Sequence, residues 1–195
     1  MLIKVIDQIT DAEQLEAAWT LYLEAFEELN SLAVQRHLMY RSEFDEVMRD
    51  PRVDKYLALE ADGTLIGLSC YTNNLEAIPL IAPQYFERHY PDDYYAKRIW
   101  YIVFVAVKPE AQGQAAFALM SEQMYLVAAT QNGMVGLDLC SYNNDVRRMS
   151  RVFRLLIGRL CNFNMTFKQI DQQSFWLYNF PAVAAEGVAE LPDAA

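Results

Sequence analysis

The sequence predicts an α/β (α+β) domain in which a mixed, twisted sheet of about six to seven strands carries helices on both faces. Segments with the two-residue repeat of strands alternate along the chain with segments that have the 3.6-residue repeat of helices. Residues 99–107 form an uninterrupted apolar run, IWYIVFVAV, which is typical of a strand buried on both faces. A helical pattern separates this run from the next strand, which favours a parallel crossover.

The composition indicates one globular domain. The 195 residues are 53% hydrophobic and 22% charged, which excludes disordered and low-complexity classes. We expect the domain to span residues 1–181 and the Ala- and Glu-rich residues 182–195 to form a flexible tail. The three cysteines are far apart and odd in number, so the sequence predicts no disulfide framework, and the start lacks the pattern of a signal peptide. We therefore expect a cytoplasmic protein.

The charge balance restricts the partners that we expect. The chain carries 26 acidic and 16 basic side chains, which give a formal net charge of -10. A negative surface repels phosphate backbones and attracts cationic or neutral molecules. The sequence therefore predicts no nucleic-acid partner, and without an apolar run of about 18 residues it predicts no membrane partner either.

Four elements are expected in the first half of the chain. Residues 2–9 alternate as a strand does, and residues 15–26 carry one apolar stripe at helical spacing. Residues 42–49 form a shorter helix for which Ser42 is the expected cap. Residues 55–71 read as a hairpin around an Asp-Gly turn.

The second half begins with a proline- and tyrosine-rich stretch at residues 72–98. We expect a long aromatic loop there, with one short helix, because loops of this length in compact domains are usually functional. After the central strand the patterns predict, in order, a crossover helix at 114–131, a strand at 134–140, a helix at 146–160 capped by Asn144 or Asp145, and closing strands at 164–170 and 174–180.

Residues 105–117, VAVKPEAQGQAAF, resemble the phosphate-binding segment of the GNAT acetyltransferase superfamily. In that family a buried strand ends in Val-x-Pro-Glu, and Gln/Arg-x-x-Gly-x-Gly/Ala then opens a helix. The backbone N–H groups of this turn hold the pyrophosphate of acetyl-CoA, because helix N-termini gather unpaired donors and partial positive charge. The order of the predicted elements extends the resemblance over most of the chain.

The resemblance implies acetyl-CoA or another acyl-CoA as co-substrate. Gln112 takes the Gln/Arg position of the motif, Ala115 that of the first Gly and Phe117 that of the second. The Phe117 ring either crowds the phosphate or turns into the core. The cofactor-binding residues that the resemblance implies are Val105 and Val107 through their backbone, Gln112, Gly113, Gln114, Ala115, Ala116, Phe117 and Asn144.

The function that the resemblance implies is transfer of an acetyl or longer acyl group from CoA to the amine of a small molecule. Two alternatives stay open. One is a catalytically inactive GNAT-fold binding or regulatory protein, because Ala115 and Phe117 depart from the motif. The other is an N-acyl synthase that takes its acyl group from an acyl-carrier protein.

Catalytic residues are harder to place from the sequence. The family's Tyr acid on the helix after the fifth strand is missing, and Ser150 is the substitute acid that the spacing offers, with a plain surface serine as the alternative. His89 is the candidate base, since its unperturbed pKa near 6.5 suits an ammonium proton. Glu87, Asp92 and Asp93 of the same loop are the alternatives for that role. The other interpretation is that these acids are plain surface charges and that the histidine caps a helix or packs against a tyrosine.

The tyrosines between residues 85 and 101 have three readings. They form a pocket for an apolar or aromatic amine acceptor, they pack beneath the loop, or they belong to a homodimer interface. The candidate substrate-binding residues are Tyr85, Tyr90, Tyr94, Tyr95 and Tyr101.

Other chemistries lack their patterns. The two histidines, His37 and His89, are far apart and no Cys pair accompanies them, so the sequence predicts no metal site. Neither a Gly-x-Ser-x-Gly nor a P-loop pattern occurs. A basic stripe that is either a solvated helix face or a phosphate contact consists of Arg147, Arg148, Arg151, Arg154 and Arg159.

Overall fold

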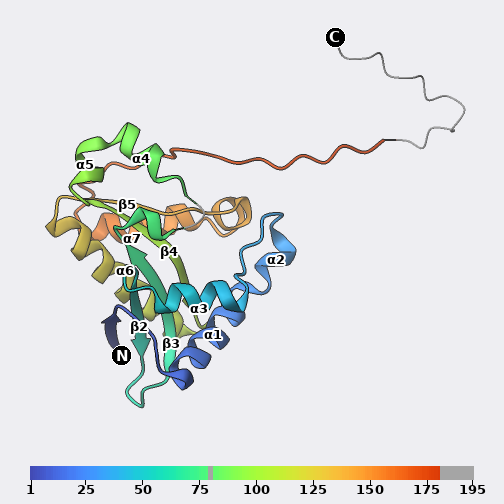
Figure 1. The fold of residues 1–195 in the computed structure, drawn as a ribbon, viewed down its shortest axis with the longest axis vertical. Helices are drawn as coiled ribbons and strands as arrows, with labels where there is room; N and C mark the ends of the chain where they lie inside the picture. Colours follow the sequence, from blue (N-terminus) through green and yellow to red (C-terminus); the bar gives the residue numbers. More distant parts are fainter. Residues whose placement is uncertain (79–80, 181–195) are drawn as a thin grey trace, which may run out of the picture.

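The computed structural model describes residues 1–78 and 81–180 and contains a five-stranded mixed sheet (Figure 1). The strand order β1-β2-β3-β4-β5 follows the sequence. The first four strands pair in antiparallel fashion, and β5 runs parallel to β4. The strands are β1 (Leu2–Ile6), β2 (Asp54–Leu59), β3 (Leu65–Thr72), β4 (Ile99–Val107) and β5 (Met134–Gly136).

Helices cover both faces of this sheet, as predicted. The helices α1 and α3 pack on one face, and α6, with α7 against it, packs on the other (Figure 1). The short helices α4 and α5 cover the end of the sheet where β4 begins. The bounds are α1 (Ala12–Phe26), α2 (Leu29–Leu32), α3 (Arg41–Arg49), η1 (Leu75–Ala77), α4 (Pro83–His89), α5 (Pro91–Tyr95), α6 (Ala111–Thr130), η2 (Tyr142–Val146) and α7 (Met149–Leu160).

The elements with strong local signals lie where the sequence predicts them. The hairpin β2–β3 and the central strand β4 match the prediction, and α1 begins at the expected cap, where the Asp11 carboxylate accepts the Gln14 N–H at 2.8 Å. The cap of α3 was predicted two residues too late. Tyr40 precedes this helix, because the Glu43 carboxylate reaches back to the Tyr40 N–H at 2.7 Å.

Three predictions for the second half are wrong. The aromatic stretch holds two short helices, α4 and α5, each beginning with a proline, instead of one. Neither Asn144 nor Asp145 caps α7. Both lie in the wide turn η2, and α7 begins only after Arg148, whose left-handed backbone (φ 55°) separates the two elements.

The closing strands at 164–170 and 174–180 are the third error, so the sheet has five strands and not six to seven. Both segments belong to one unpaired stretch, residues 163–180, which joins no ladder in the described part of the chain. Their apolar pattern is strand-like, but a strand forms only where an edge pairs with it. The predicted domain boundary at residue 181 and the tail at 182–195 lie outside the described residues.

Two hydrophobic clusters hold the layers together. One lies between α1, α3 and the sheet, and includes the rings of Tyr22, Phe44 and Phe104. The other lies beneath α6 and includes Trp100 and Met120. Within the described ranges, no helix combines the length and the apolarity that crossing a membrane requires.

A fully buried lysine ties three segments together near the start of β2. The Lys55 ammonium donates to the carbonyl oxygens of Asp7, Asp50 and Val53 at 2.6–2.7 Å. We expect Lys55→Met to lower the free energy of unfolding by at least about 3 kcal/mol, because each buried carbonyl left without a donor costs about 1–3 kcal/mol. Urea unfolding measures this loss. The exposed Lys4 of β1 is the control, and equal losses for Lys55→Met and Lys4→Met would contradict the structural role.

Candidate functional site

The sheet splits between β4 and β5. The two strands pair only at their beginnings, where Ile99, Trp100 and Tyr101 face residues 134–136. Beyond Tyr101, β4 continues for six more residues, whereas residues 137–140 leave the ladder. The two strands therefore diverge after Tyr101, and we call the space between them the split.

The split leaves the backbone of β4 open on one side. The Lys108 N–H donates to the Ile66 carbonyl at 3.0 Å, so these two residues form a hydrogen-bonded pair between β3 and β4. Along an antiparallel ladder, such pairs alternate with pairs that form no hydrogen bond. By this alternation, the cross-strand pairs that contain Val105 and Val107 form no hydrogen bonds with β3. Their N–H and C=O groups consequently point away from β3 and into the split, where an extended ligand could accept and donate hydrogen bonds.

A tyrosine and an aspartate bridge the point at which the strands part. The Tyr101 hydroxyl donates to Asp138 Oδ1 at 3.0 Å. Burial, followed by the nearby Asp138 charge, raises the pKa of Tyr101 well above its usual range, so the phenol stays protonated. Gly136 makes room for the ring, because a Cβ at this residue would lie 2.8 Å from Tyr101 Cδ2.

His37 approaches this pair from the stretch between α2 and α3. Its Nε2 atom is buried and has no hydrogen-bond partner among the described residues. Burial lowers the pKa of His37 below its usual value, while the Asp138 charge opposes the shift. At neutral pH the imidazole is thus uncharged, close to a carboxylate, and holds an unused nitrogen.

Two side chains fix the backbone around His37. The Tyr22 hydroxyl donates to the His37 carbonyl at 3.1 Å and accepts the Met39 N–H at 3.0 Å. Asn30 Oδ1 accepts the N–H groups of His37 and Leu38 at 3.3 and 3.4 Å. Tyr22 is itself held among aromatic rings of the core, so this loop is anchored to α1 and α2.

The turn η2 lies next to the start of α2. An ion pair of 3.5 Å joins Arg147, at the end of η2, to Glu28 beside α2. Asn143 Oδ1, within η2, is buried and lacks a hydrogen-bond partner in the described part of the chain. Because buried polar atoms are normally satisfied, a ligand in the split could supply the partners that the Nε2 atom of His37 and this amide oxygen lack.

The predicted phosphate-binding segment has a tight turn where α6 begins. A Cβ at Gly113 would lie 1.7 Å from the Lys108 carbonyl oxygen, so only glycine fits. Ala116 is buried beneath α6, whereas Ala115 is exposed. The structure does not describe the side chains of Gln112 and Gln114.

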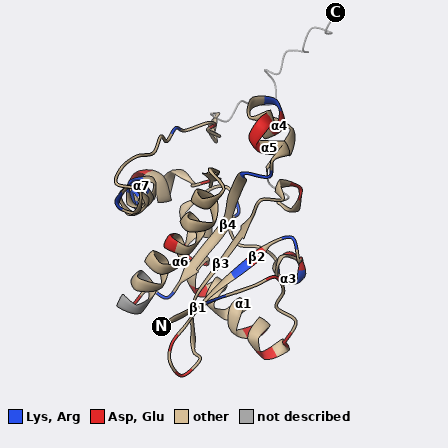
Figure 2. Ribbon diagram, turned by 90° about the vertical axis from the view of Figure 1, so that its left-hand side faces the viewer, with Lys and Arg blue, Asp and Glu red and all other residues tan. Residues whose placement is uncertain are grey.

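The ring of Phe117 does not turn into the buried core beneath α6. It packs edge-on against Phe153 of α7, with 5.1 Å between the ring centroids, and is half-buried. It therefore joins α6 to α7. The basic positions of α7 gather on this side of the molecule (Figure 2), and one of them, Arg154, lies over the ring of Phe167 at 4.7 Å.

The predicted catalytic residues His89 and Ser150, and the predicted cofactor-binding residue Asn144, lie elsewhere. His89 is exposed at the end of α4, and its ring lies tilted against that of Tyr85, with 4.5 Å between the ring centroids. Ser150 is exposed in the first turn of α7. Asn144 lies in η2, where its side chain donates to Asp145 Oδ1 at 2.9 Å. The structure does not bring these residues to the Tyr101–Asp138 pair.

Of the five candidate tyrosines, only Tyr101 is in the split. The other four lie on or between α4 and α5, at the end of the sheet where β4 begins. The hydroxyls of Tyr94 and Tyr95 donate to Glu76 and Glu87, and that of Tyr85 donates to the Ile170 carbonyl at 3.4 Å. The ring of Tyr90 lies 5.1 Å from Lys168 Nζ.

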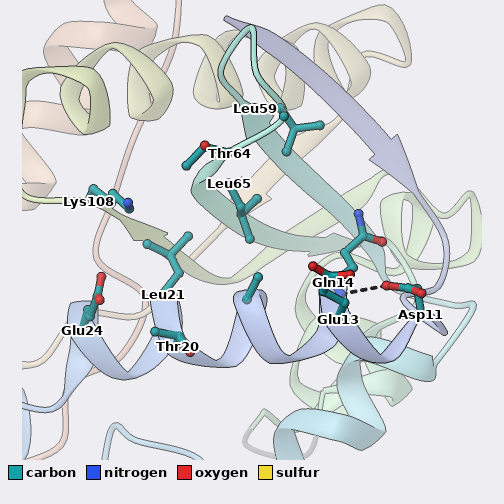
Figure 3. A pocket seen from close by; sticks show the side chains of 12 residues that line it. Asp11, Glu13, Gln14, Thr20, Leu21, Glu24, Leu59, Thr64, Leu65 and Lys108 are labelled. Atoms are coloured by element: carbon teal, nitrogen blue, oxygen red, sulfur yellow. Dashed lines mark hydrogen bonds between the residues drawn. The ribbon is translucent and has the colours of Figure 1, made fainter.

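A separate open groove of about 530 Å³ lies between α1 and the β2–β3 hairpin (Figure 3). Its lining includes the carboxylates of Asp11, Glu13 and Glu24 as well as Lys108. Three carboxylates disfavour a polyphosphate ligand. We therefore place the candidate site at the split and not in this groove.

The residue that the sequence analysis missed is His37. It lies in an irregular stretch, about one hundred residues before Asp138, and no pattern in the sequence joins the two.

We expect Gly136→Ala to displace the Tyr101 ring and to break its hydrogen bond to Asp138. A fixed tyrosine gives a near-ultraviolet circular dichroism signal. Loss of that signal, with an unchanged far-ultraviolet signal, would report the displacement of the ring. A wild-type near-ultraviolet spectrum would contradict the close packing.

Comparisons with known proteins support the fold alone. No model of a protein family and no curated protein matches the chain. Among solved structures, a mutant of the BH1408 protein from Bacillus halodurans matches with a TM-score of 0.52 at 11% identity, over 91% of this chain and 100% of that chain. A probable acetyltransferase matches with a TM-score of 0.50 at 15% identity, over 94% and 99% of the two chains. The chain has a GNAT-like fold.

Proposed function

We propose that the protein transfers an acyl group from an acyl-CoA to the amine of a small molecule, at the split between β4 and β5. The observation that carries this proposal is the uncharged His37, whose buried Nε2 has no hydrogen-bond partner in the described part of the chain and whose pKa responds to Asp138, the acceptor of the Tyr101 hydroxyl. The similarity of the fold to a probable acetyltransferase supports the reaction class.

The chain offers a track for the acyl-CoA. The N–H and C=O groups of Val105 and Val107 face the split and match the amides of an extended pantetheine arm. The track ends at the tight turn of Gly113, where the first amides of the 20-residue helix α6 favour a pyrophosphate. A thioester bound in this way would lie along β4 on the side of Tyr101.

The chemistry that we infer needs one base. The neutral amine attacks the thioester carbonyl, His37 Nε2 accepts the proton that the amine loses, and the C–S bond breaks to release CoA as thiolate, which is then protonated. His37 suits the step because it is uncharged at neutral pH and its backbone is held in place. Tyr101, fixed on Asp138, borders the position of the reacting carbon.

The protein's charge makes the choice of acceptor testable. Since the chain has a net charge of -10, we expect tyramine to be acylated with a kcat/KM about tenfold or more above that of tyrosine, which differs only by a carboxylate. Initial rates at low ionic strength give the ratio. Equal rates, or a preference for tyrosine, would contradict an acceptor site in a negative field.

The pH profile follows from the shift at His37. The kcat/KM should rise with pH through a midpoint below about 6.5, because the imidazole must lose its proton to act as base and burial lowers its pKa. Asp138→Asn keeps an acceptor for Tyr101 but removes the charge that raises the His37 pKa. The midpoint should therefore move to still lower pH, and a shift to higher pH would contradict the assignment. Using the same acceptor for both proteins cancels its own ionisation.

The direct test is release of free CoA thiol. Acetyl-, hexanoyl- and decanoyl-CoA are each mixed with the protein, with and without tyramine, and a thiol reagent reads the release. We expect release that depends on the amine for at least one acyl chain. If none of them reacts and an acyl-loaded carrier protein does, the donor is wrong; if that fails too, the proposed function is wrong.

A further inference from the structure

The chain ends, in its described part, with an apolar stretch that its own body does not cover. We name residues 163–180 the C-terminal arm. Leu177 is 97% and Trp176 79% exposed, although both are side chains that folded proteins usually bury. The large apolar side chains exposed on the arm are Phe163, Phe167, Ile170, Phe175, Trp176, Leu177, Tyr178 and Phe180.

The first half of the arm is attached to the body. Arg154 of α7 lies over the Phe167 ring, Lys168 lies over the Tyr90 ring, and the Tyr85 hydroxyl donates to the Ile170 carbonyl. Beyond Ile170 the arm leaves the body and runs outward (Figure 1). These contacts set the direction in which residues 171–180 project.

The second half of the arm has the pattern of a strand that is covered on both faces. In an extended chain, Trp176 and Tyr178 fall on one face and Phe175 and Leu177 on the other. A strand with one solvated face would alternate apolar and polar residues, and this one does not. The segment therefore suits an edge beside which other elements cover its apolar side chains.

The sheet offers a suitable edge at β5. In the described part of the chain no strand pairs with the outer side of β5, and Val135 in its middle is 43% exposed. An open apolar edge readily accepts another strand. Beside this edge, α6 and α7 lie on one face of the sheet, while α4 and α5 cover its end.

We propose that two copies of the chain exchange their arms, so that residues 174–180 of one copy pair with the β5 edge of the other. This inference goes beyond the proposed function and does not depend on it. Each copy presents one unpaired apolar strand and one unpaired edge, so a two-fold arrangement uses both in each copy and then closes. The attachment at Phe167–Ile170 favours a second copy over the chain's own edge, because it directs the arm outward.

The area available suits a stable dimer. Each aromatic side chain buries about 150–250 Å² when it is covered, and the arm beyond Ile170 holds four of them. Two arms together therefore bury on the order of 1,600 Å², the size of a standard specific interface.

The test separates exchange from folding back. In a background with Cys140→Ser and Cys161→Ser, one chain carries Val135→Cys and another carries Leu177→Cys, while the fully buried Cys70 stays. The two chains are unfolded, mixed and refolded, and a short bis-maleimide then links thiols that lie close together. We expect a covalent dimer from the mixture and a two-chain mass by light scattering for the unmodified protein. A monomer, an open-ended aggregate, or a chain with both cysteines that links only to itself overturns the proposal.

A charge in the arm provides a second measurement. Leu177→Asp should raise the dimer dissociation constant at least about tenfold, because it would bury a carboxylate in the interface. Val34→Asp is the control, since Val34 is 78% exposed in the α2–α3 stretch, away from the arm. Equal effects of the two substitutions would also overturn the proposal.

Discussion

His37→Gln should lower kcat about 10²- to 10⁴-fold while leaving the KM for acyl-CoA within about twofold. The glutamine keeps a polar side chain in the same space but cannot accept a proton from the attacking amine. The loop around residue 37 should keep its position, because Tyr22 and Asn30 hold it through the backbone and not through the imidazole. Steady-state rates of thiol release, with an unfolding curve for each protein, measure both effects.

The second histidine makes this test discriminating. His89 is the base that sequence reasoning favours, but it is exposed on α4, against the ring of Tyr85. The two substitutions, His37→Gln and His89→Gln, are therefore measured side by side. If His89→Gln lowers kcat while His37→Gln stays fully active, the result would contradict the site that we propose.

Gly113→Ala should weaken acyl-CoA binding by about 10²-fold. A methyl group there would lie 1.7 Å from the Lys108 carbonyl oxygen, so the turn must move by more than an ångström to reach an allowed contact. Displacements of this size cost about 10²-fold when they misplace binding groups. Calorimetric titration with acetyl-CoA measures the affinity.

The folded state of the Gly113→Ala protein is measured separately. The strain should lower the free energy of unfolding by about 1–3 kcal/mol, a loss that leaves most domains folded. Binding at wild-type affinity would show that the α6 turn does not hold the ligand. Normal affinity together with normal stability would show that the turn is less tight than the structure indicates.

Elements whose signals are local were predictable from the sequence. The apolar run of β4 and the stripe of α1 each contain their own pattern, and the structure places both where they were expected. The cap of α3 was misplaced because Tyr40 is a weak cap by residue type, and the Glu43 carboxylate compensates for it. Propensity does not report such a side-chain contact.

Features that depend on distant contacts were not predictable. The arm has a strand pattern, but its pairing depends on an edge that the arm's own residues do not specify. Likewise, His37 and Asp138 come together only because β5 stops after three residues and Tyr22 fixes a loop from α1. The turn at Gly113 was accessible only through the family resemblance.

Hydrogen–deuterium exchange with and without acetyl-CoA tests the central claim most directly. In the free protein the amides of Val105 and Val107 face the split without a strand to pair with, so they should exchange quickly. We predict that acetyl-CoA slows exchange in residues 103–113 and 136–140, with little change in α1 and the β2–β3 hairpin. Protection confined to the groove between α1 and that hairpin, or no protection with any acyl-CoA, would contradict a site at the split.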